Sequence, residues 1–103
     1  MISTLLLAAL VQSAAMTAQR QEFVGCLRAA VTSAKTEKVG ADAFDAYVRQ
    51  RCAPIEQSFT AAMLAFDLKN KVPRKQSASD AKVQIDDYVA TAVDRYKAMT
   101  GAQ

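Results

Sequence analysis

Apolar residues recur at steps of three and four along most of this chain, which is the spacing of one face of an α-helix. The longest stripe has an average step of about 3.67 residues, close to the α-helical repeat. It consists of Phe44, Val48, Cys52, Ile55, Phe59, Met63 and Phe66. Pro54 lies inside this stripe and is expected to bend the helix, because proline has no N–H to donate. The stripe keeps its phase across Pro54, so it predicts one kinked helix over 42–69 in preference to two helices.

Two further stripes predict one helix before and one helix after this long element. The first begins near residue 19 and consists of Phe23, Leu27, Ala30, Val31 and Ala34. The last consists of Ile85, Val89, Ala92, Tyr96 and Met99, with Val93 beside them. The sequence therefore predicts an all-α fold, a small three-helix bundle whose first two helices form an antiparallel hairpin.

Polar residues and helix breakers between the stripes predict where the helices end. The segments 36–41 and 69–78 lose the apolar period and contain glycine or proline, which is typical of connections. Side-chain caps and a terminal glycine are the usual signals at helix ends. The expected signals are a capping box of Asp42 and Asp45, a Ser77 or Ser79 cap on the last helix, and a stop at Gly101.

The two cysteines of the chain lie on the first two stripes. In an antiparallel hairpin whose connection is centred near residues 38 and 39, facing residues have numbers that sum to about 77. Cys26 and Cys52 satisfy this condition, as do the apolar pairs Ala30 with Val48 and Ala34 with Phe44. The matched heights predict a structural disulfide between Cys26 and Cys52. Two free core cysteines are the alternative if the protein stays in a reducing compartment.

The first 19 residues contain no charged side chain, and an apolar run, Leu5–Val11, lies within them. Such a run followed by small residues is typical of a secretory signal peptide. Ser13 and Ala15 fit cleavage before Met16, and Ala18 fits cleavage before Gln19. We therefore predict a signal peptide over 1–18, a single helical domain over 19–103, and export to the periplasm or the medium.

Two other interpretations of this segment remain open. No Lys or Arg precedes the apolar run, although signal peptides normally carry positive charge there. A retained membrane anchor would need roughly 20 apolar residues, and the run has about ten. The segment can also simply extend the first helix, because Leu and Ala are good helix formers. In the uncut chain we expect it to be helical and to project beyond the packed domain.

The composition argues against catalysis and against a metal or cofactor site. The chain has no His and only three Gly, so it lacks the commonest general base and the glycines of a phosphate-binding loop. Two cysteines without His do not make a zinc site. Asp86, Asp87 and Asp94 are the candidate carboxylates near the C-terminus, and their spacing predicts an ordinary helix surface. The sequence predicts no enzyme, no cofactor and no metal ion.

The segment 69–75 holds the one visible concentration of charge, formed by Lys69, Lys71, Arg74 and Lys75 without an acidic neighbour. It predicts either a solvated loop or weak contact with an anionic partner, such as a membrane surface. No aromatic residue alternates with these cations, and export separates the protein from nucleic acid. A nucleic-acid partner is therefore not expected.

A second candidate surface is an apolar groove along the far half of the long helix. It would be lined by Phe59, Met63 and Phe66 and edged by Tyr47, Tyr88 and Tyr96. Such stripes more often form core. Our principal expectation is thus an exported helical protein with a structural or protein-interaction role, its partner and oligomeric state being open. A groove carrier or chaperone-like binder, or an anion-binding accessory factor using 69–75, is the alternative.

Overall fold

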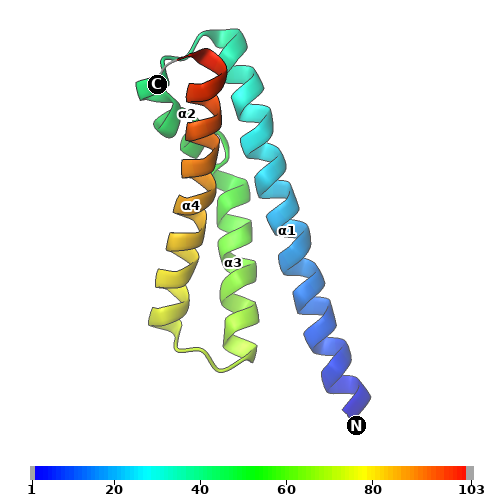
Figure 1. Cartoon of the computed structure of the whole chain (residues 1–103). Helices are drawn as coiled ribbons and strands as arrows, with labels where there is room; N and C mark the ends of the chain where they lie inside the picture. Colours follow the sequence, from blue (N-terminus) through cyan, green and yellow to red (C-terminus); the bar gives the residue numbers. More distant parts are fainter. Residues whose placement is uncertain (1, 102–103) are drawn as a thin grey trace.

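The computed structural model describes residues 2–101, and their side chains from residue 13 onward. In this part of the chain the fold consists of helices without any strand, which confirms the predicted all-α class (Figure 1). The elements are α1 (Ile2–Glu37), a short 3-10 turn η1 (Ala41–Ala43), α2 (Phe44–Arg51), α3 (Ala53–Lys69) and α4 (Arg74–Thr100).

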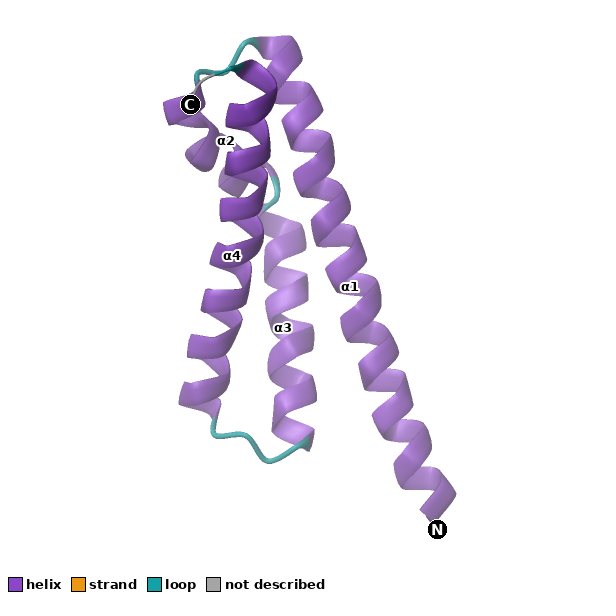
Figure 2. Ribbon diagram, in the orientation of Figure 1, coloured by secondary structure: helices purple, strands orange, loops and turns teal. Residues whose placement is uncertain are grey.

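Three long rods make the bundle. α1 and α4 run in one direction and α3 runs in the other, while the connections lie at the two ends of the rods and at the α2 to α3 junction (Figure 2). The core is formed mainly by the predicted stripes, with Ala81 added and with Ile55 and Phe66 only half-buried. The buried residues are Phe23, Leu27, Ala30, Val31, Ala34, Phe44, Val48, Cys52, Phe59, Met63, Ala81, Ile85, Val89, Ala92 and Tyr96. Spacings of three and four place these residues on one face of each helix, and that face packs inward.

The first helix extends through the apolar N-terminal segment, as expected for the uncut chain. α1 is continuous from Ile2 to Glu37, and its N-terminal part projects past the α3–α4 connection (Figure 1). Ala14 and Ala15 are exposed. Met16 is the first apolar side chain in the described part of α1 that packs against the core.

The long second element is divided at Cys52 into α2 and α3, whose axes are inclined to each other (Figure 2). Cys52 itself has φ −101° and ψ 10°, outside helical geometry. The physical cause is Pro54, which cannot donate to the carbonyl of Gln50 and whose ring clashes with it. The chain nevertheless keeps its phase, because Cys52 N–H donates to Val48 and its carbonyl accepts from Glu56. The bend is therefore present, but the prediction of one helix over 42–69 was wrong, because the structure has two helices that meet at Cys52.

The predicted start of this element near residue 42 agrees with the structure, in which η1 and α2 begin at Ala41 and Phe44, but the predicted cap was wrong. Asp42 lies in the 3-10 turn, and neither that turn nor α2 has a side-chain cap. Asp45 instead pairs with Arg49 one turn later, at 2.8 Å. An ion pair between side chains four residues apart also stabilises a helix, so Asp45 stabilises α2 without taking part in a cap.

The predicted start of the last helix was also wrong. α4 begins at Arg74, directly after Pro73, so neither Ser77 nor Ser79 is its cap. Proline has no N–H that needs a partner, so it can stand at a helix start without a side-chain cap. The C-terminal stop is confirmed, because Gly101 adopts the left-handed conformation with φ 75°. Met99, expected in the core, is 47% exposed in the last turn of α4.

Candidate functional site

Cys26 and Cys52 are joined as the helix register predicts. Their Sγ atoms are 2.08 Å apart and their Cα atoms 6.0 Å apart. Cys26 lies in the middle of α1 and is half-buried, whereas Cys52 is buried at the α2–α3 junction. The bond therefore fastens the bend of the second element to the first helix. A bend without such a tether could open, because it lacks a normal helical hydrogen bond.

A second set of contacts closes the end of the bundle near the α1–α2 connection. The rings of Phe44 and Tyr96 stack with centroids 4.3 Å apart. The Tyr96 hydroxyl donates to the carbonyl of Ala34 at 3.2 Å and also bonds the carbonyl of Val39. The Ala34 carbonyl lies near the end of α1 and also accepts from the Val39 N–H at 2.9 Å, whereas Val39 lies in the connection just beyond α1, so Tyr96 ties this connection to the core. This arrangement explains the buried hydroxyl without a ligand.

The acidic residues of α4 lie on the helix surface. Asp86 accepts hydrogen bonds from Lys82 at 2.9 Å and from Arg49 at 3.0 Å. These two cations, first Lys82 and then Arg49, hold the pKa of Asp86 below its ordinary value. Asp87 and Asp94 are exposed. Residues 2–101 bring together no group of three or more side chains able to hold a metal ion.

The four basic residues of 69–75 do not share one loop. Lys69 ends α3, Lys71 lies in the connection, and Arg74 and Lys75 form the first turn of α4. All four are exposed, and in the part of the chain that the structure describes none of them forms an ion pair. Cations at a helix N-terminus oppose the helix dipole, so Arg74 and Lys75 gain nothing from their position in α4.

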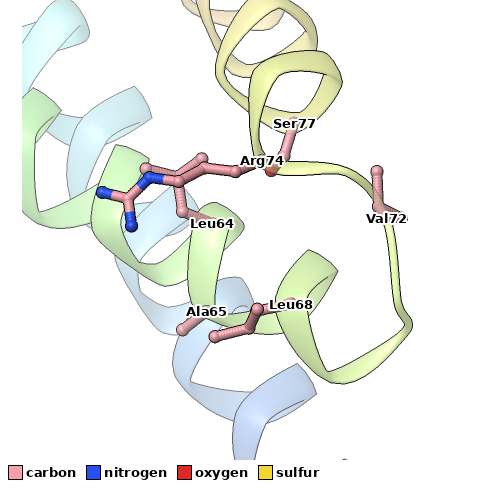
Figure 3. Close-up of a pocket in the computed structure, with 6 residues that line it drawn as sticks. All are labelled: Leu64, Ala65, Leu68, Val72, Arg74 and Ser77. Carbon is pink, nitrogen blue, oxygen red and sulfur yellow. The ribbon is translucent and has the colours of Figure 1, made fainter.

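An apolar hollow lies beside these cations. It has a volume of about 220 Å³ and is lined by Leu64, Ala65, Leu68, Val72, Arg74 and Ser77 (Figure 3). Leu68 is 74% exposed, the most of any large apolar side chain described. The Arg74 side chain extends across α3 beside Leu64 (Figure 3). One end of the bundle thus presents exposed leucine among unpaired positive charges.

The hollow is not the groove expected from the sequence. Phe59 and Met63 are buried in the core, and Phe66 is half-buried. Their stripe packs against α1 and α4, which are the other two long helices of the bundle. The hollow lies on a different face of α3, whose signal in the sequence is the i, i+4 pair of Leu64 and Leu68. Of the three tyrosines, Tyr96 is core and Tyr47 and Tyr88 are half-buried.

The chain matches no protein-family model, and neither the curated proteins nor the solved structures contain a significant match to it. None of the helices in residues 2–101 combines the length and the apolar character needed to cross a bilayer.

Proposed function

We propose that this protein is an exported, disulfide-stapled helical protein that acts by binding an envelope component and has no catalytic centre. The observation that carries the proposal is the Cys26–Cys52 bond, which joins α1 to the α2–α3 junction. Disulfides persist in oxidising compartments and are reduced in the cytosol. The apolar run Leu5–Val11, followed by small residues, supports the same address.

Cell fractionation tests the export proposal. The full chain is expressed in a Gram-negative host, and each fraction is treated with a thiol-alkylating reagent under denaturing conditions before intact-mass measurement. We expect a chain shorter than 103 residues, without alkylation, in the periplasmic or secreted fraction. A variant lacking 2–15 is the matched control and should stay inside the cell with two alkylated thiols. A full-length, doubly alkylated chain confined to the cytosol would contradict the proposal.

We further propose that the α3–α4 end binds an anionic membrane surface. Lys69, Lys71, Arg74 and Lys75 carry four of the 13 basic side chains. The remaining nine are outnumbered by the ten acidic residues of the chain, so the excess of positive charge comes from the segment 69–75, which Asp67 and Asp80 flank. Each basic residue near an anionic bilayer contributes about 1 kcal/mol of binding. Leu68, which lines the hollow together with Arg74, adds an exposed apolar side chain beside the cations, and apolar contact strengthens interfacial binding.

Vesicle co-sedimentation tests this surface. We expect binding to vesicles that contain phosphatidylglycerol, weakening as salt rises, and little binding to vesicles of phosphatidylcholine alone. Replacing the four cations by Gln should reduce binding at least about tenfold. The matched control replaces three Lys and one Arg at the opposite end, namely Lys35, Lys38, Arg95 and Lys97. An equal loss in both variants would show only an effect of net charge and would contradict a specific surface.

A further inference from the structure

We infer that the leader is removed by hydrolysis of the Ala15–Met16 peptide bond, so that the exported chain begins at Met16. This inference depends on the proposed export. The sequence alone allows two positions, because small residues at Ser13 and Ala15 fit cleavage before Met16 and Ala18 fits cleavage before Gln19. The packing of α1 separates the two.

Met16 belongs to the packed domain. It is half-buried and packs against the core, whereas the two residues before it and the two after it are exposed. With Met63 and Phe66 it lines a cavity of about 170 Å³ between α1, α3 and α4. Cleavage before Gln19 would remove this side chain and leave the neighbouring apolar atoms to water. Cleavage before Met16 retains this side chain. In the part of the leader whose side chains the structure describes, the apolar residues Ala14 and Ala15 are exposed, so their removal uncovers no apolar packing.

The new terminus is also compatible with the charges around the cavity. Hydrolysis adds water across the amide bond: the hydroxyl completes the Ala15 carboxylate, and the Met16 nitrogen leaves as an α-ammonium group. The catalyst is an endopeptidase of the export machinery that cuts after small-x-small sequences. Asp67 and Asp80 line the same cavity as Met16, and so does Arg20. The two carboxylates outnumber the one guanidinium, so the net charge of the lining favours an ammonium group and opposes its repulsion by the helix dipole.

Intact mass and N-terminal sequencing of the exported protein identify the cut. The expected chain spans 16–103. The matched variants are Ala15→Leu and Ala18→Leu, because a bulky residue directly before a cut prevents cleavage. We expect Ala15→Leu to abolish the chain that begins at Met16, and Ala18→Leu to leave it unchanged.

Three other results would overturn the inference in distinguishable ways. A chain beginning at Gln19, including its cyclised pyroglutamyl form, would place the cut at the alternative site. A full-length chain in the exported fraction would show that the leader is retained, while export itself would stand. A full-length chain found only in the cytosol would remove both the cut and the proposed export.

A stability measurement tests the packing argument separately. Met16→Ala removes the side chain that lines the cavity and leaves Ser13 and Ala15 before the cut unchanged, and Thr17→Ala changes its exposed neighbour. In the purified, oxidised exported protein, we expect Met16→Ala to melt about 4 to 8 °C lower, and Thr17→Ala to melt within about 2 °C of the unaltered chain. Equal melting temperatures for all three proteins would refute a packing role for Met16.

Discussion

Replacing Cys26 and Cys52 by Ala should remove a large share of the stability of this domain. The bond closes a chain segment whose ends are 26 residues apart. In the chain-entropy model, the unfolded chain regains about 11.8 cal/mol/K when such a loop is opened, which is about 3.5 kcal/mol at 25 °C. Small domains have a total free energy of unfolding of about 5–15 kcal/mol. The loss is therefore a quarter to more than half of the total.

The assay is urea unfolding of the exported protein followed by far-UV circular dichroism, with and without reductant. We expect the double variant and the reduced protein to agree with each other and to unfold about 3.5 kcal/mol more easily than the oxidised protein. For a domain of this size the corresponding fall in melting temperature is about 14 to 28 °C. The denaturant dependence should also become steeper, because an unfolded chain without the crosslink exposes more surface.

Two outcomes would refute the reasoning. If oxidised and reduced proteins differ by less than about 1 kcal/mol, the crosslink does not limit the unfolded chain as the entropy model requires. If the reduced protein matches the oxidised one while only the Ala variant is weak, the cost lies in the packing around buried Cys52. The comparison of reduction with substitution separates these two origins.

Three further predictions concern single side chains. Ser77→Ala removes the hydroxyl that donates to Asp67 at 2.7 Å and should lower the free energy of unfolding by about 1.5–3 kcal/mol in urea titrations, whereas Ser79→Ala at an exposed position should leave it unchanged. The folded pKa of Asp86 lies below its ordinary 3.8. The contribution of its ion pairs to the free energy of unfolding is therefore present above 3.8 and is lost as pH falls through the folded pKa, so Asp86→Asn should lose less stability on acidification than the unaltered protein. Phe44→Ala empties a fully buried position and should cost about 3–5 kcal/mol in thermal unfolding.

The disulfide could be predicted from sequence because two independent patterns indicate the same pair of residues. The apolar stripes define the inward faces, and the length of the connection defines which heights face each other across the hairpin. Ala30 and Val48, paired by the same rule, are both fully buried. The bend near Pro54 follows from backbone chemistry alone. The stripes therefore predicted both the faces that pack and their register.

The side-chain caps at the helix starts could not be predicted in the same way, because a polar side chain near a helix start has several possible partners. Ser77 has the residue type of a cap, yet the fold places it against Asp67 of the preceding helix. That contact exists only once α3 and α4 are packed together. Serine does favour cap positions, but here the contact between the two packed helices outweighs that local preference.

The rotation of α3, and with it the exposed face, follows from the position of Cys52. A helix turns about 100° per residue. Met63 is 11 residues beyond Cys52 and lies about 20° from its direction, whereas Leu68 is 16 residues beyond it and lies about 160° away. Because Cys52 must face α1 to reach Cys26, Met63 must turn inward and Leu68 outward. Their exposures, 5% and 74%, agree with this phase even though the helix is interrupted at Cys52. The crosslink that fastens the bend therefore also determines which leucine the basic end of the bundle presents to a partner.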